Sequence, residues 1–163
     1  YNQAVHIFSK AEMVSPIFHI FFLVVATCSW ALTPHDPCPG VPPVVSLDLK
    51  GCTQLPCTFV KGTNIEFIIE VLADHDIKTL TADVKAFALG TETSYPLPGD
   101  VGNVCDHLMD GECPLEKGED VKYHLLFPIS ESYPTIPLVI QFSIVSEFGT
   151  TGCLRLPSVV VDG

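Results

Sequence analysis

Six cysteines downstream of an apolar leader constrain the fold of this chain more than any other feature. They are Cys38, Cys52, Cys57, Cys105, Cys113 and Cys153. An even number of cysteines in a short exported chain indicates a set of disulfides and an oxidising compartment. Spacing alone does not decide how they pair. The first and the last of the six nearly bracket the chain, so a bridge between them would close almost the whole fold into one loop.

The leader itself has the features of a targeting segment. After Met13 the chain is almost entirely apolar from Ile17 to Ala26, and small residues follow up to Ala31. This pattern predicts a signal peptide that starts near Met13 and is cleaved after Ala31. The apolar run is short for a helix that spans a bilayer, and an uncleaved anchor is the alternative. We therefore expect an upstream segment plus signal peptide over 1–31 and a single domain over 32–163.

The charge balance narrows the classes of partner. The chain has 8 Lys and Arg against 19 Asp and Glu, a formal net charge of -11, and its basic residues do not cluster. A strongly acidic chain without a basic patch argues against nucleic acid and against anionic membrane surfaces as electrostatic partners. The same charge favours solubility in a chain with a high apolar fraction.

Short runs with a period of two residues dominate the chain after the leader. Apolar side chains, many of them β-branched or aromatic, alternate with polar ones in these runs. We expect strands at 44–50, 65–71, 81–89, 121–127, 138–145 and 156–161. Clusters of Pro, Gly, Asn and Asp separate them. The pattern predicts an all-β fold, an immunoglobulin-like antiparallel β-sandwich of about seven strands.

Some of these runs are apolar on both faces. Leu138, Ile140 and Phe142 share one face of their strand, while Val139 and Val145 add apolar side chains to the other. A sandwich with such a surplus can hold an apolar ligand between its sheets. From the pattern alone a fully packed core is favoured, because protein interiors are close-packed as a rule.

Five short segments, taken in order, carry a family resemblance. They are the Cys52–Cys57 segment, Tyr95-Pro96-Leu97-Pro98, Cys113-Pro114-Leu115-Glu116-Lys117, residues 127–136, and Cys153-Leu154-Arg155-Leu156-Pro157. With six cysteines in register, they resemble the ML lipid-recognition family, which includes the Niemann-Pick type C2 proteins and the group 2 mite allergens. The likeness runs from Asp36 to Val161.

The resemblance implies a disulfide pairing and a site. The implied bridges are Cys38–Cys153, Cys52–Cys57 and Cys105–Cys113. The implied fold has two antiparallel sheets with an internal hydrophobic cavity for sterols, fatty acids or similar lipids. In family members an aromatic residue before the Pro-x-Pro stretch, and a later apolar residue and tyrosine, flank the mouth of this cavity. The matching positions, and the expected ligand-binding residues, are Tyr95, Ile129 and Tyr133.

The function implied by the resemblance is that of a secreted, extracellular or lysosomal lipid carrier. Its ligand would be a sterol or another hydrophobic lipid such as a fatty acid, and its delivery partner a membrane sterol transporter. We expect a monomer without cofactor or metal. Alternatives of the same fold are a carrier of small hydrophobic semiochemicals and an immune lipid-recognition protein. A further alternative is an adhesion module without a ligand pocket, since fold alone does not fix function.

An enzyme is not expected from this sequence. A hydrolase needs a nucleophile, a base and an oxyanion site, and no Gly-x-Ser-x-Gly motif occurs. The histidines are scattered without the spacing of metal ligands. The cluster Asp74-His75-Asp76 is best interpreted as a solvated turn, because Asp and its polar neighbours favour turns.

Overall fold

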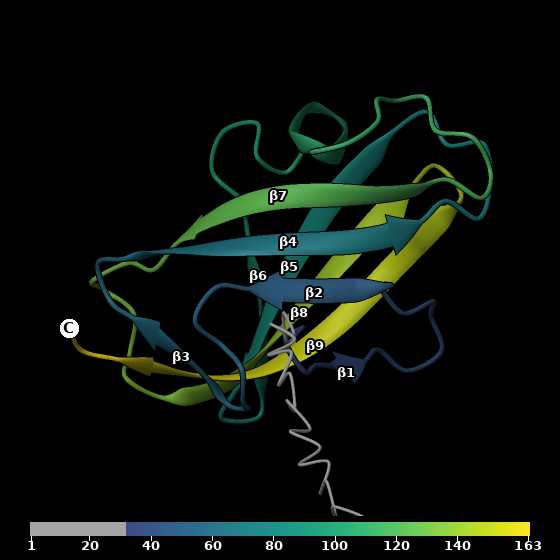
Figure 1. The fold of residues 1–163 in the computed structure, drawn as a ribbon. Coiled ribbons are helices and arrows are strands. Elements are labelled where there is room, and N and C mark those ends of the chain that lie inside the picture. Colours follow the sequence, from purple (N-terminus) through teal and green to yellow (C-terminus); the bar gives the residue numbers. More distant parts are fainter. Residues whose placement is uncertain (1–31) are drawn as a thin grey trace, which may run out of the picture.

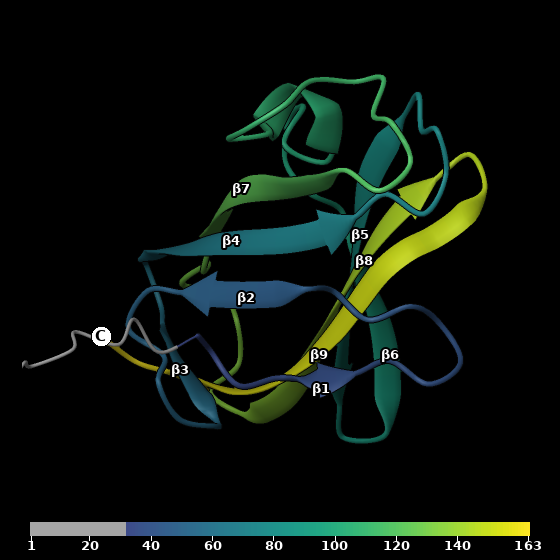
Figure 2. The same cartoon turned by 45° about the vertical axis from the view of Figure 1, so that its right-hand side comes forward.

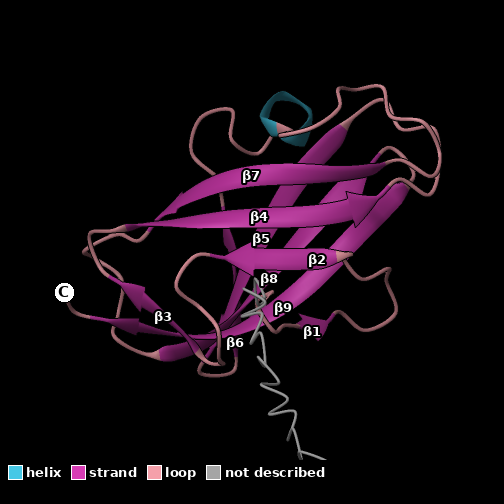
Figure 3. Ribbon diagram, viewed as in Figure 1, coloured by secondary structure: helices cyan, strands magenta, loops and turns pink. Residues whose placement is uncertain are grey.

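The computed structural model describes residues 32–163, and the predicted signal peptide and its cleavage site lie outside the described residues. Nine strands and one short 3-10 helix make up the described part of the chain (Figures 1 and 3). In chain order they are β1 (Asp36–Pro37), β2 (Ser46–Leu49), β3 (Cys57–Val60), β4 (Asn64–Leu72), β5 (Leu80–Ala88), β6 (Thr91–Tyr95), the helix η1 (Val104–His107), β7 (Asp120–Pro128), β8 (Pro137–Ser146) and β9 (Gly149–Val161). Over 32–163 we find no helix with the length and apolarity needed to cross a bilayer.

The strands form two sheets of unequal size. The larger sheet has the order β1-β9-β8-β5-β6, with β3 also paired to β9, and the smaller has the order β2-β4-β7. The smaller sheet lies in front in Figure 1, and its strands cross those of the larger sheet at an angle. Neighbouring strands are antiparallel except for β3, which runs parallel to β9. The predicted all-β sandwich is confirmed, with this one parallel pair as an addition.

Each of the six predicted runs lies on a strand. The limits agree within two residues except for β9, which begins at Gly149 rather than at 156. The early part of β9 contains Gly149 and Gly152, and glycine weakens the pattern by which a strand is recognised. Three short strands, β1, β3 and β6, were not predicted. β6 has the sequence Thr-Glu-Thr-Ser-Tyr and almost no apolar alternation, because it is an exposed edge strand.

The core lies between the sheets and uses alternate residues of each strand. On β4, Phe67, Ile69 and Val71 are buried, and the residues between them are partly exposed. The ring of Phe67 lies 4.7 Å from that of Phe142 on β8 in the opposite sheet, between ring centroids. It also meets Phe59 of β3 edge to face. Such aromatic pairs contribute about 1 kcal/mol each beyond the area that they bury, and here they hold the two layers together.

Three disulfides reinforce the sandwich, and they are the pairs that the resemblance implied. Cys38–Cys153 joins the end of β1 to β9, Cys52–Cys57 closes the loop before β3, and Cys105–Cys113 ties η1 to the loop before β7. The first bridge spans 115 residues of sequence. A loop of this size restricts the unfolded chain most, by about 4–5 kcal/mol in the chain-entropy description.

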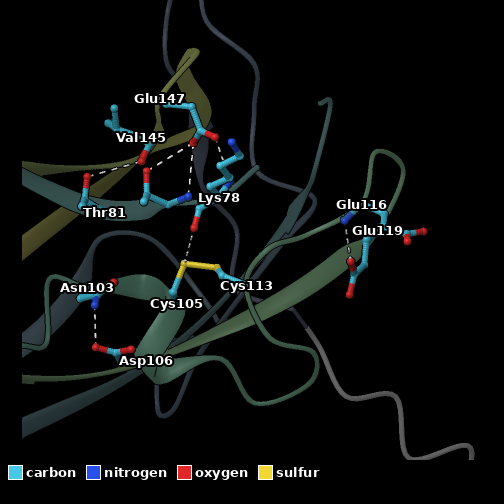
Figure 4. The surroundings of a disulfide bond; sticks show 11 residues. Lys78, Thr81, Asn103, Cys105, Asp106, Cys113, Glu116, Glu119, Val145 and Glu147 are labelled. Carbon is cyan, nitrogen blue, oxygen red and sulfur yellow. Dashed lines mark hydrogen bonds between the residues drawn. A yellow bond between two sulfur atoms is a disulfide. The ribbon is translucent and has the colours of Figure 1, made fainter. Parts of the chain in front are cut away.

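The Cys105–Cys113 bridge belongs to the end of the sandwich at the top of Figure 1, where η1 lies. Figure 4 shows its surroundings, including Glu147 in the turn between β8 and β9. The Glu147 carboxylate accepts hydrogen bonds from the backbone N–H groups of Lys78, at 2.8 Å, and Thr79, at 3.3 Å. The bond from Lys78 is the main cause that lowers the pKa of Glu147. Glu147 therefore ties the segment before β5 to the β8–β9 turn.

Candidate functional site

A cavity of about 280 Å³ lies between the two sheets. This volume is near the lower end of the range for small-molecule sites, roughly 300–1,000 Å³. Its walls come from β3, β5, β6, the end of β7, the loop at 129–136, β8 and β9. The pattern alone favoured a fully packed core, which is wrong, and the internal cavity that the resemblance implied is present.

Small residues on β5 explain why this part of the core is hollow. Ala86 and Ala88 face the cavity together with Val84. In the sheet register, Ala86 stands between Thr93 of β6 and Ile140 of β8, which also line the cavity. An alanine side chain ends at Cβ, so these positions leave space that a leucine or phenylalanine would fill. The void is therefore a consequence of side-chain volume on one strand.

The opposite wall is a loop fixed at both ends. The backbone N–H of Gly62 donates to the carbonyl of Ile129, and the N–H of Ile129 donates to the carbonyl of Thr63, both at 2.8 Å. At the other end, the N–H of Val160 on β9 donates to the carbonyl of Ile136 at 3.1 Å. These bonds attach the loop to the β3–β4 turn and to β9. They hold Ile129, which is only 3% exposed, in the cavity wall.

The three residues expected from the sequence all line this cavity. Tyr95 ends β6, and its ring centroid lies 4.8 Å from that of Phe127 and 6.1 Å from that of Tyr133, the latter edge to face. Ile129 completes the set. Burial raises the pKa of the Tyr133 hydroxyl, and the neighbouring Tyr95 raises it further. The Tyr133 phenol is therefore neutral at physiological pH.

The cavity opens beside the edge strand β6. Thr91 and Thr93 of β6 and Pro134 of the facing loop line the cavity and are also exposed to solvent. Figure 2 shows the β5–β6 hairpin at the bottom of the molecule, at the end opposite η1. We call the opening between these three residues the mouth. β6 has no neighbour on its outer side among the described strands, and loop 129–136 supplies further lining residues there.

Sequence reasoning missed most of the wall. The alternation over 81–89 placed Val84, Ala86 and Ala88 on one face, but it carried no sign that this face borders a void. Thr91 and Thr93 were missed because β6 itself was not predicted. Within residues 32–163, no three His, Cys, Asp or Glu side chains gather in a way that could hold a metal ion.

Comparisons with known proteins agree with this geometry. The family model for the ML domain matches residues 33–158. The mite group 2 allergen Pso o 2 of Psoroptes ovis is 29% identical over 121 residues, which cover 73% of this chain and 80% of the allergen. The NPC intracellular cholesterol transporter 2 homolog a of Drosophila melanogaster is 26% identical over 113 residues, 68% of this chain and 74% of that protein.

A solved structure agrees with the fold. The Niemann-Pick type C2 protein from the Japanese carpenter ant superposes with a TM-score of 0.68 at 18% sequence identity. The superposition covers 78% of this chain and 99% of the ant protein. At this identity the likeness concerns the arrangement of the strands.

Proposed function

This chain belongs to the ML domain family, and from that membership we propose that it is a lipid carrier, which holds a sterol or another hydrophobic lipid between its sheets. The observation that carries the proposal is the cavity, whose lining is almost entirely apolar and has no charged side chain among the described residues. The Drosophila relative, named as a cholesterol transporter, supports a sterol as one ligand.

Apolar burial supplies the driving force in this proposal. A lipid that loses about 300 Å² of apolar surface gains roughly 8 kcal/mol at ~25 cal/mol per Å². The entropy lost on association removes a large part of this gain. Dissociation constants near or below about 1 μM are the expected result. Tyr95, Ile129 and Tyr133 are the proposed contacts at the ligand, because their side chains meet at the cavity wall.

The setting of the carrier is part of the proposal. Three disulfides favour an oxidising compartment, so we place the protein outside the cell or in the lysosome lumen. We propose that it acts as a monomer without catalytic activity and delivers its lipid to a membrane sterol transporter. An adhesion module is not favoured, since such a module has no use for an internal cavity.

Lipid extraction tests the function directly. The protein secreted from cells that express the full sequence is purified, extracted with organic solvent and analysed by mass spectrometry, and the stripped protein is titrated with a fluorescent sterol. We expect copurified lipid and saturable binding. Absence of both, with the three disulfides intact, would contradict the carrier function.

A charge placed in the wall gives a second test. Ile129→Asp puts a carboxylate where the structure has a buried apolar side chain. An unpaired charge in an apolar site opposes binding of an apolar ligand. Sterol binding should fall at least about tenfold, with the far-UV circular dichroism of the sandwich retained. Unchanged binding in a folded variant would mean that the ligand lies elsewhere.

A further inference from the structure

We propose that the cavity selects lipids with an uncharged polar head group and discriminates against carboxylates. This inference rests on the proposed carrier function and names the class of lipid that the site takes. Alcohols, sterols and esters belong to the accepted class, and ionised fatty acids belong to the rejected one.

The polar groups of the lining are hydroxyls. Thr91 and Thr93 at the mouth, and Tyr95 and Tyr133 deeper in the wall, are the polar side chains that line the cavity in the described chain. A hydroxyl both donates and accepts hydrogen bonds, so it suits the head group of an alcohol or an ester. It carries no charge, however, and cannot neutralise a carboxylate that leaves water.

The basic side chains on the cavity strands are absent from the lining and have other partners. Lys85 of β5 forms an ion pair with Glu92 of β6, with its Nζ 2.7 Å from Oε1. Arg155 of β9 donates from Nε to Oε1 of Gln141 at 2.9 Å, and its guanidinium lies over the Phe87 ring. Basic side chains held in such contacts are poor partners for a ligand carboxylate.

The remaining basic groups next to the cavity elements also lie outside the cavity lining. Lys61, directly after β3, forms an ion pair with Asp162, with its Nζ 2.7 Å from Oδ1. On β7, His124 lies 2.9 Å from Glu66, and exposed Lys122 alternates with the buried residues of the strand. None of these groups is among the residues that line the cavity.

The net charge of the whole chain also opposes the binding of an anion. Glu92 of β6 is already paired with Lys85, and the Glu131 carboxylate lies against Gly62 in the β3–β4 turn, so neither counts as a free charge at the mouth. The chain carries a formal net charge of -11. The surrounding field therefore disfavours the approach of an anion, although salt weakens this effect.

A lipid with a carboxylate head group can bind to this site in two ways, and both are unfavourable. It can keep its head in water and withdraw part of its tail from the cavity, or it can take up a proton before it binds. At about pH 7 dodecanoate should therefore bind at least about tenfold more weakly than dodecanol, its uncharged counterpart of equal length. Lowering the pH toward the ordinary pKa of a carboxylic acid, about 4–5, should narrow this gap.

Competition against a bound fluorescent sterol measures this ratio. Dodecanol and dodecanoate each displace the sterol from the stripped, full-length secreted protein, and both are used below their micellar concentrations. A ratio of affinities of about ten or more in favour of the alcohol supports the inference. Equal or tighter binding of dodecanoate at neutral pH overturns it and leaves the carrier function intact. Failure of the sterol and both alkyl lipids to bind overturns the carrier function itself.

A charge introduced at the mouth provides the matched variant. Thr93→Lys places a cation on a residue that lines the cavity, whereas Ser94→Lys places the same charge on the neighbouring exposed residue outside the lining. Thr93→Lys should shift the dodecanoate-to-dodecanol affinity ratio toward dodecanoate by about tenfold, and Ser94→Lys should shift it by less than about twofold. Equal shifts in the two variants would overturn the inference, because they would show a general charge effect.

Discussion

The ring of Tyr95 at the end of β6 lies 4.8 Å from the ring of Phe127 at the end of β7, so an aromatic contact joins the two sheets beside the cavity. β6 is an edge strand of the larger sheet and β7 an edge strand of the smaller one. The contact thus joins the edge strands of the two sheets, and both of its rings line the cavity.

Removal of the Tyr95 ring should weaken lipid binding. Tyr95→Ala takes away a wall that offers an apolar face to the ligand and contacts Phe127 and Tyr133. We expect sterol affinity to fall about tenfold. Tyr95→Phe keeps the ring and should retain most of the affinity, which separates packing from the hydroxyl. Fluorescent sterol titration measures both variants, and equal losses in the two would show that the hydroxyl, not the ring, matters.

Filling the cavity should abolish binding while the fold is kept. Ala86→Phe projects a ring into the void from β5, between its register partners Thr93 of β6 and Ile140 of β8. Because the space of about 280 Å³ is already present, the added ring has room that a packed core would not give. We expect loss of saturable sterol binding with little change in the thermal midpoint of the lipid-free protein.

The control for this variant lies on the same hairpin. Ser94→Phe adds the same ring at an exposed position of β6 that does not line the cavity. It should leave the sterol dissociation constant within about twofold of its original value. If Ala86→Phe binds sterol as well as Ser94→Phe does, the ligand does not occupy the void.

The long strands could be predicted from the sequence because burial on one face imposes alternation. On β7, buried Val121, Tyr123 and Leu125 alternate with more exposed residues, and this alternation is typical of a strand with one face in the core. The short strands could not be predicted in this way. β3 and β6 exist because β9 and β5 offer them partners, and this tertiary pairing leaves little trace in strands of four or five residues.

The site was only partly predictable for a related reason. Tyr95, Ile129 and Tyr133 were located through a family resemblance, and their meeting at one wall follows from the fold. The void itself depends on what Ala86 and Ala88 do not fill. A small residue on an inner face looks the same in the sequence whether a larger neighbour covers it or not, so the sequence pattern could not separate a packed core from a cavity.

Gly152 on β9 should tolerate no side chain. A Cβ placed there would lie 2.9 Å from Cγ1 of Val71 and 3.3 Å from Cγ1 of Val44, both buried. Gly152→Ala therefore overpacks the contact between the sheets and should lower the free energy of unfolding by about 1–3 kcal/mol. Denaturant unfolding measures this change. The added substitution Val71→Ala frees space, so the two changes together should cost less than the sum of their separate effects, and strict additivity would contradict the proposed clash.

Glu147 should make stability depend on acid pH. Hydrogen bonds from the Lys78 and Thr79 backbone lower the pKa of Glu147 in the folded protein, so the carboxylate stabilises the fold above its unfolded pKa, near 4.5. That contribution is lost as the pH falls through the lower, folded value. Glu147→Gln should therefore reduce the free energy of unfolding at about pH 7, and the difference from the original protein should shrink as the pH falls below 4.5. Denaturant unfolding at pH values on either side of 4.5 tests this, with Glu112→Gln at an exposed position as the control. A Glu147→Gln difference that stays constant with pH would mean that Glu147 contributes through packing and not through its charge.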